Sequence, residues 1–177
     1  MCPPFESKGR TDLDTHADTG VVGSNALFSH DYGRTVNVCG YDPSKGATSG
    51  PPVISAAIAH VVKEAGEDVM LVTHQAIGVP TIKHNLSCPF QLGSNDVMVN
   101  NCPRMFESNP TEESHSIIAT DQYGDKYQIP LSLHNVTSCF SSRKPPLEEH
   151  QACDNTVELT SEEPEWDPHD PVIAREE

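Results

Sequence analysis

The chain has 177 residues, which suits one domain with tails because domains commonly span about 100–200 residues. Hydrophobic residues make up 36% of the chain and 15 residues are proline, so a compact core should not extend through the whole sequence. The formal charge of −15, from 26 acidic and 11 basic residues, disfavours direct binding to nucleic acids, whose phosphate backbone is also negative.

The two ends of the sequence differ in composition from its middle. Residues 1–9 form a leader with two prolines and no periodic pattern. Residues 144–177 carry eleven of the acidic residues against two basic ones, and this proline-rich, acidic stretch predicts a disordered linker. The sequence shows no signal peptide, no membrane-spanning run and no zinc-binding cysteine spacing. We therefore expect an intracellular, cytoplasmic protein with free thiols and no membrane contact.

Alternation of polar and apolar residues predicts the first strands over residues 10–13, 21–22 and 35–39. A loop rich in glycine, proline and serine follows over residues 42–52. Two apolar runs, residues 53–62 and 69–77, are separated by a charged turn that contains glycine, which favours a hairpin. The alanine-rich residues 55–60 would alternatively begin a helix.

The second half of the chain predicts one short helix and further strands. Residues 84–92 are compatible with the helix, with Ser87 as its N-cap and Pro89 in its first turn. A strand is predicted over residues 97–99, and a second hairpin over residues 116–120 and 126–133. The expected architecture is mainly β with one or two short helices, and residues 106–143 form an additional β-rich segment.

The run from Leu13 to Gly20, LDTHADTG, contains two overlapping candidates for an aspartic-peptidase motif. Such enzymes place two carboxylates around one water. Like charges about 3 Å apart cannot both ionise, so one carboxyl stays protonated and the other acts as a base. Asp18 begins the literal Asp-Thr-Gly, whereas Asp14 directly follows the strand predicted over residues 10–13. A catalytic aspartate should end a strand, which favours Asp14 and leaves Asp18 as the competing candidate.

The sequence around these aspartates resembles the peptidase region of copia-type retrotransposon polyproteins. After Asp14 the run T-H-A-D-T-G-V-V is similar to the D-T-G-A-D-x-T-V pattern of retroviral-type peptidases, with His16 where glycine is usual. Residues 79–92, VPTIKHNLSCPFQL, resemble the V-P-x-x-x-H-N-L-L-S-x-x-Q-L stretch that follows the peptidase flap in copia-type polyproteins. The chain looks like a divergent branch in which Asp-Ser/Thr-His-Ala-Asp-Thr is the usual form, with similarity over residues 8–105.

The resemblance implies a retropepsin-like closed β-barrel over residues 10–105. It also implies an aspartic endopeptidase that forms a homodimer and cleaves peptide bonds of its own polyprotein, in a virus-like particle where the element is active. The catalytic residue of each copy would be Asp14 or Asp18, with Thr15 bracing the two active-site loops against each other. The hairpin over residues 53–77 would cover the substrate as a flap.

Other site chemistries fit the sequence less well. Asp14, His16 and Asp18 occupy every second position, which on a strand would place all three side chains on one face, as a metal site requires. They lie partly in a predicted turn, however, so neither a metal nor a cofactor is expected. Cys88 begins the predicted helix and follows His84 by four residues, yet a buried structural cysteine is favoured over a nucleophile. Because His16 replaces glycine, the alternative function is a catalytically dead retroelement fragment, at most a non-enzymatic dimerisation or binding module.

Overall fold

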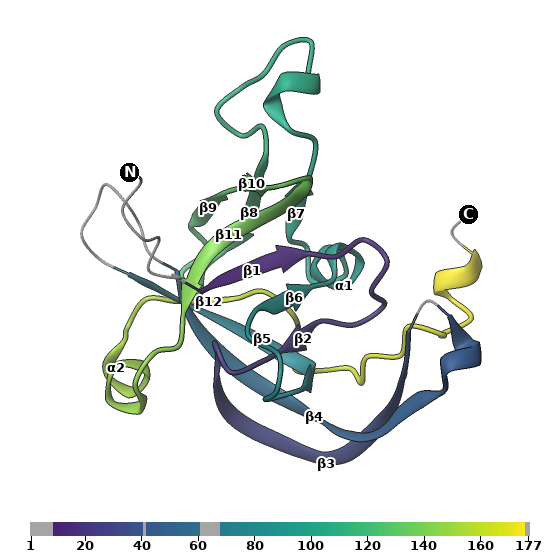
Figure 1. The fold of residues 1–177 in the computed structure, drawn as a ribbon. Coiled ribbons are helices and arrows are strands. Elements are labelled where there is room, and N and C mark those ends of the chain that lie inside the picture. Colours follow the sequence, from purple (N-terminus) through teal and green to yellow (C-terminus); the bar gives the residue numbers. More distant parts are fainter. Residues whose placement is uncertain (1–8, 41, 61–67, 176–177) are drawn as a thin grey trace, which may run out of the picture.

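The computed structural model describes residues 9–40, 42–60 and 68–175, so the leader, apart from Gly9, lies outside the described residues. The fold is mainly β with two short helices, as predicted (Figure 1). In chain order the elements are β1 (Arg10–Leu13), β2 (Val21–Val22), β3 (Leu27–Cys39), η1 (Pro43–Lys45), β4 (Ala47–His60), β5 (Val69–Gly78), β6 (Asn85–Ser87), α1 (Pro89–Gly93), β7 (Met98–Asn100), η2 (Arg104–Phe106), β8 (Ser116–Thr120), β9 (Lys126–Pro130), β10 (Ser132–His134), β11 (Thr137–Arg143), α2 (Leu147–Ala152), β12 (Thr156–Glu158) and η3 (Ile173–Arg175).

Nine strands form one mixed sheet, hydrogen-bonded in the order β10-β11-β1-β6-β2-β5-β4-β3, with β12 added along β5. Because β11 also pairs with β4, the six strands β11, β1, β6, β2, β5 and β4 close into a ring. Parallel pairing brings β1 beside β6, with Leu13 opposite Ser87, although 74 positions separate them in the sequence. The strands β7, β8 and β9 form a separate antiparallel sheet.

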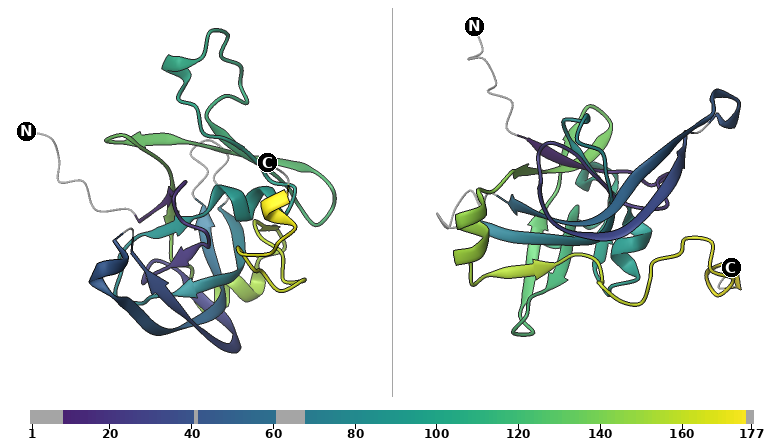
Figure 2. Two further views of the ribbon diagram at one scale, coloured as in Figure 1. Left: turned by 90° about the vertical axis from the view of Figure 1, so that its right-hand side faces the viewer. Right: turned by 90° about the horizontal axis from the view of Figure 1, so that it is seen from below.

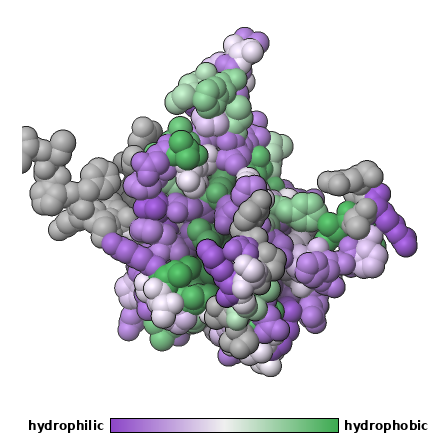
Figure 3. Space-filling view, turned by 45° about the vertical axis from the view of Figure 1, so that its right-hand side comes forward, coloured by the Kyte–Doolittle hydropathy of each residue, from purple (hydrophilic) through white to green (hydrophobic). Residues whose placement is uncertain are grey.

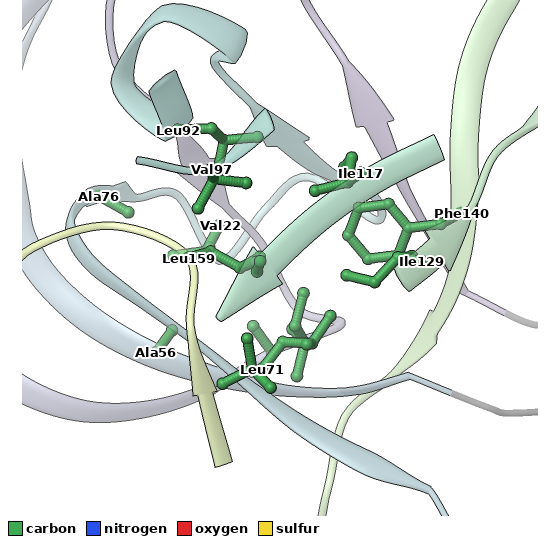
Figure 4. Close-up of a cluster of buried hydrophobic side chains, with 14 of the residues drawn as sticks. Val22, Ala56, Leu71, Ala76, Leu92, Val97, Ile117, Ile129, Phe140 and Leu159 are labelled. Carbon is green, nitrogen blue, oxygen red and sulfur yellow. The ribbon is translucent and has the colours of Figure 1, made fainter. Parts of the chain in front are cut away.

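The hydrophobic core lies between the ring and this second sheet. All ten residues of β5 are buried, because β4, β2 and β12 pair along it. Figure 4 shows side chains from both sheets meeting, including Leu71 of β5, Ile117 of β8 and Phe140 of β11, which are at most 1% exposed. Burial of such side chains is the main stabilising contribution to a fold of this kind. The second sheet therefore covers the open side of the ring.

The two predicted hairpins are present. The first is β4 paired antiparallel with β5, and the helix considered over residues 55–60 is wrong because those residues belong to β4. Most of its turn, residues 61–67, lies outside the described part of the chain. The second is β8 paired with β9 through the turn at residues 121–125.

The long hairpin of β3 and β4 was not predicted. Figures 1 and 2 show that these strands sweep past the body of the molecule and end in an arm around η1. The predicted loop over residues 42–52 is wrong from Ala47 onward, because β4 begins there and pairs with β3 in spite of Gly50 and two prolines. Register shifts interrupt this pairing, as expected where proline lacks an N–H group.

The prediction of a disordered C-terminal linker is wrong for residues 147–160. This part of the chain forms α2 and then β12, which lies parallel to β5. Val157 and Leu159 alternate with the polar residues Glu158 and Thr160, so their side chains face the same side of the strand. Both side chains are fully buried in the core. The acidic composition of the segment concealed this alternation.

The helix predicted over residues 84–92 is shorter than expected. Residues 85–87 form β6, and α1 begins at Pro89. The predicted N-cap Ser87 is wrong, because Ser87 is a buried strand residue and the cap is Cys88, whose Sγ accepts the Gln91 N–H at 3.4 Å. No helix in the described part of the chain is long and apolar enough to cross a membrane.

Candidate active site

Asp14 is the first residue after β1 and begins the loop that leads to β2. Its backbone N–H donates to the carbonyl of Ser87 at 3.0 Å, which extends the parallel pairing of β1 and β6 by one residue. Its carboxylate Oδ1 accepts the backbone N–H of His16 at 2.9 Å, the geometry of a turn closed by an aspartate side chain. The backbone position and the carboxylate orientation of Asp14 are therefore both held by hydrogen bonds.

His16 occupies the position where the resembling motif has glycine. It lies exposed in the turn, and the backbone there does not adopt a positive φ, since the non-glycine residues with positive φ in the described chain are Gln75, Asp96, His115 and Asn135. The backbone of this loop therefore does not require glycine at position 16. The exposed imidazole adds a side chain to the surface of the turn.

The far end of the loop is held by different partners. The carbonyl of Gly20 accepts the Ile77 N–H at 2.8 Å, and its N–H donates to the Gln91 side-chain oxygen at 2.9 Å. Asp18 is exposed, and its backbone carbonyl accepts the Trp166 indole N–H at 3.1 Å. Asp18 therefore contributes a main-chain contact to the C-terminal segment, whereas its side chain points to solvent.

Buried amide and hydroxyl groups hold the base of the site. Asn85 is 1% exposed, and its side-chain oxygen accepts the Gly23 N–H at 3.0 Å while its Nδ2 donates to Thr11 Oγ1 at 3.4 Å. The Thr11 hydroxyl lies 3.0 Å from the Ser142 hydroxyl of β11. This network connects β1, β6 and β11 behind the loop, so the Asn85 of the H-N-L-S block supports the loop that carries Asp14.

An open depression of about 610 Å³ lies beside Asp14, bordered by the turn and by the β10–β11 hairpin. Its lining includes Asp14, Thr15 and His16 of the turn and the hairpin residues Val136 and Thr137. Val136 is 95% exposed at the hairpin tip. A carboxylate held in a fixed turn at the rim of such a depression can contact a second molecule.

A groove of about 720 Å³ lies at the other end of the loop. It is lined by Asp18 and Thr19, by residues 36–39 of β3 and by residues 165–169 of the C-terminal segment. The sequence did not assign Trp166, Gln75 or Gln91 to the site. The sequence did indicate that Gln75 is unusual, since it is a polar residue inside the mainly apolar run that forms β5.

The thiol of Cys88 does not have the surroundings of a nucleophile. It is 2% exposed and caps α1. Burial raises the pKa of this thiol, and the charges of Asp18 and Asp14 raise it further, so the reactive thiolate is disfavoured. The nearby His84 instead has its Nε2 3.2 Å from Arg10, and burial together with that guanidinium lowers its pKa. Cys88 is a structural cysteine.

A serine, a histidine and a glutamate lie in hydrogen-bonding order on neighbouring strands. Ser55 Oγ lies 2.9 Å from His74 Nδ1, and His74 Nε2 lies 3.3 Å from the Glu158 carboxylate. Ser55 is only 2% exposed, and the Tyr32 hydroxyl lies 2.9 Å from its Oγ. A nucleophilic hydroxyl must be accessible to a carbonyl carbon. The arrangement is therefore a buried polar network that connects β3, β4, β5 and β12.

Within the described residues no group of three or more histidine, cysteine, aspartate or glutamate side chains is placed to hold a metal ion, and Asp14, His16 and Asp18 do not converge. All five described cysteines, among them Cys88, are free thiols.

Comparisons with known proteins give no further assignment. No protein-family model matches the chain. No curated protein and no solved structure gives a significant match either. The resemblance to copia-type peptidase regions therefore rests on the two sequence blocks, and the activity and partners that it implies stay predictions.

Proposed function

We propose that the chain is one half of an aspartic endopeptidase, a retropepsin-like β-barrel from the polyprotein of a copia-type retrotransposon. The observation that carries the proposal is the setting of Asp14. It directly follows a strand of a closed ring, its N–H is bound by the Ser87 carbonyl, and its carboxylate is oriented by the His16 N–H. This placement supports Asp14 over Asp18 as the catalytic aspartate.

One chain supplies one such carboxylate, so the reaction requires a homodimer in which Asp14 meets Asp14 of the partner subunit around one water. The proximity of the two carboxyls keeps one of them protonated. The ionised carboxylate takes a proton from the water as its oxygen adds to the peptide carbonyl carbon, and the protonated carboxyl donates to the carbonyl oxygen. The carboxyl that took the water proton then protonates the amide nitrogen. As the C–N bond breaks, a hydroxyl of the gem-diol returns its proton to the other carboxylate, which gives an acid and an amine and restores the pair. Thr15 is exposed beside Asp14, and in this proposal it braces the two loops across the dimer.

The substrate cover in this proposal is the β3–β4 hairpin. The hairpin over residues 53–77 was expected to be the flap, but β5 is buried along its whole length and cannot open over a substrate. The arm of β3 and β4 extends away from the ring (Figure 2). Residues 36–39 of β3 line the groove beside Asp18 and Thr19. A peptide bound there would run along the loop toward Asp14.

The alternative function is a non-enzymatic dimerisation or binding module. The observation in its favour is His16, whose imidazole lines the depression beside Asp14 where the resembling motif has only a glycine hydrogen. Both functions place a second molecule beside Asp14, and they differ in whether a bound peptide is hydrolysed.

The test is cleavage of peptides from the flanking polyprotein by the full chain at pH about 4–6, in the presence and absence of a statine-type inhibitor. The proposal predicts cleavage that the inhibitor abolishes, and inhibitor binding detected by calorimetry. A chain that neither cleaves these peptides nor binds the inhibitor is not an aspartic endopeptidase, and the binding module is then the remaining function.

A further inference from the structure

The segment after β12, residues 161–169, lies across the end of the candidate loop, and we name it the strap. Figure 1 shows it leaving β12 and running past β5 and α1 toward the β3–β4 arm. The indole N–H of Trp166 donates to the Asp18 carbonyl at 3.1 Å and lies 3.2 Å from the Thr19 hydroxyl oxygen. The Trp166 ring also lies 6.2 Å from the Phe90 ring of α1, centroid to centroid. The strap is therefore docked on the loop by specific contacts.

A single buried side chain holds the strap backbone. Gln75 is 3% exposed, and its Nε2 lies 3.0 Å from the Ser161 carbonyl and 2.8 Å from the Pro164 carbonyl. Its Oε1 accepts the Trp166 backbone N–H at 2.6 Å and an Arg34 N–H at 2.7 Å. A buried amide whose donors and acceptor are all used in this way fixes the strap in one position.

The backbone of Gln75 is connected to the candidate loop. Gln91 Nε2 donates to the Gln75 backbone carbonyl at 3.2 Å, and the Gln91 side-chain oxygen accepts the Gly20 N–H at 2.9 Å. Gln75 also has a φ of 53°, a conformation that costs free energy for a residue other than glycine. The strap, β5 and the end of the loop therefore form one connected unit, and the strap belongs to the architecture of the site.

The groove beside the loop has the strap as one wall and β3 as the other. Its lining brings together Asp18 and Thr19 of the loop, residues 36–39 on the β3 side, and Trp166 and Asp167 on the strap side. The β3 strand ends the pairing order of the sheet, so its outer edge has no neighbouring strand among the described residues. A free strand edge pairs with an extended peptide through main-chain hydrogen bonds.

The side chains that line the groove are more acidic than basic. Asp18, Glu165 and Asp167 line it, and Arg34 is the one arginine or lysine in that lining. Arg34 Nη1 lies 3.2 Å from Glu165 Oε1, whereas neither Asp18 nor Asp167 has an ion-pair partner among the described residues. One oxygen of Asp167, Oδ1, accepts the His169 backbone N–H at 2.9 Å. Figure 3, which turns the right-hand side of Figure 1 toward the viewer, shows a mostly hydrophilic surface with separate hydrophobic areas. A basic side chain complements the groove, and an acidic one is repelled.

We propose that the strap completes a peptide-binding groove, in which an extended peptide pairs with the free edge of β3, packs against Trp166 and places a basic side chain between Asp18 and Asp167. Under the proposed function this peptide is the substrate, and the proposal rests on that function only for the cleavage that follows binding. Trp166 and Asp167 are then specificity-determining residues, although they lie in the acidic segment outside the ring.

The test uses the full-length Asp14→Asn chain, so that a bound peptide is not consumed. Trp166 is the only tryptophan in the sequence, and its emission therefore reports ligand entry into the groove directly. The probes are two matched hexapeptides of alternating valine and threonine, one with a central lysine and one with glutamate at the same position. The lysine peptide should shift the emission of Trp166 and bind about tenfold more tightly than the glutamate peptide.

Substitutions then locate the contact. Asp167→Asn should remove most of the preference for lysine, whereas the control Asp125→Asn, in the distant β8–β9 turn, should leave it unchanged. With dye-labelled lysine peptide, Trp166→Ala should weaken binding about tenfold and Trp166→Phe much less, because phenylalanine keeps an aromatic wall. Equal binding of both peptides, no shift of Trp166 emission, or full affinity in the Trp166→Ala chain would overturn the proposal. Binding without cleavage in the unsubstituted chain would count against the peptidase alone.

Discussion

Asp14 and Asp18 lie four residues apart on one loop, and the fold holds them in different ways. Asp14 continues the parallel pairing of β1 with β6, and its carboxylate is fixed by the His16 N–H. Asp18 belongs to an exposed bend whose carbonyl binds Trp166 of the strap. The literal Asp-Thr-Gly therefore makes main-chain contacts to the strap, and under the proposed function the divergent Asp-Thr-His supplies the catalytic carboxylate. The proposal thus weights the position of an aspartate at the end of a strand above its match to three letters.

The largest expected effect separates the two carboxylates directly. Asp14→Asn should lower kcat for peptide cleavage by about 10²–10⁴-fold, because it removes the acid–base group of the proposed pair. Asp18→Asn should keep kcat and raise KM for peptides with a basic residue, since the exposed side chain contributes only charge. Steady-state kinetics on the two variants measures the difference, with Asp125→Asn as the control. Equal activity in the Asp14 and Asp18 variants would exclude both assignments.

The support behind the loop should be sensitive to a single methyl group. A Cβ at Gly23 would lie 2.3 Å from the backbone oxygen of Ile82, so Gly23→Ala must displace the chain that follows β2. We expect a loss of about 1–3 kcal/mol in the free energy of unfolding. Gly93→Ala is the matched control, because nothing lies within 4 Å of its Cβ position and its φ is not positive. Urea denaturation should show a large loss for Gly23→Ala only; equal stabilities would contradict the packing described here.

The cap of α1 should contribute less. Cys88→Ala removes the Sγ acceptor for the Gln91 N–H, which should cost about 1 kcal/mol, whereas Cys88→Ser keeps an acceptor and should cost less. Neither variant should lose the peptidase activity proposed for Asp14. Loss of cleavage in a folded Cys88→Ser chain would instead indicate a thiol nucleophile.

The smallest effect concerns pH. Burial lowers the pKa of His60, His84 and His115 below the ordinary value of 6.5 in the folded chain. As the pH falls through about 6.5, the unfolded chain binds protons that the folded chain does not, so the free energy of unfolding decreases. Urea denaturation at pH about 7.5 and 5.5, a range in which carboxylates stay ionised, should show lower stability at the lower pH. His60→Gln should reduce this difference. Greater stability at pH 5.5 would contradict the burial of these histidines.

Local patterns in the sequence were sufficient for much of the ring. The alternation over residues 10–13, the pair Val21 and Val22, and the apolar runs of β4 and β5 were predicted as strands because each has a clear period of two or a buried run. The closure of the ring was not predictable in this way. It depends on pairing between β11 and both β1 and β4, which are far apart in the sequence.

The candidate site was predictable only at one end. Asp14 was found because a motif and a strand end coincide there. The strap was missed because its acidic composition resembles that of a linker, although the alternation of Val157 and Leu159 with polar residues marks β12 just before it. The partners Gln75 and Gln91 were missed because a buried amide is recognisable only from the carbonyl and N–H groups that the fold brings to it.

The most direct measurement of the central claim is the stoichiometry of inhibitor binding. A statine-type inhibitor titrated calorimetrically into the chain should bind with one molecule per two chains, because each chain contributes one Asp14 to a shared site. The Asp14→Asn chain should not bind it, and the Asp18→Asn chain should bind it with the same stoichiometry. Binding of one inhibitor per chain, or undiminished binding by the Asp14→Asn chain, would contradict the assignment of Asp14 as half of a dimeric active site.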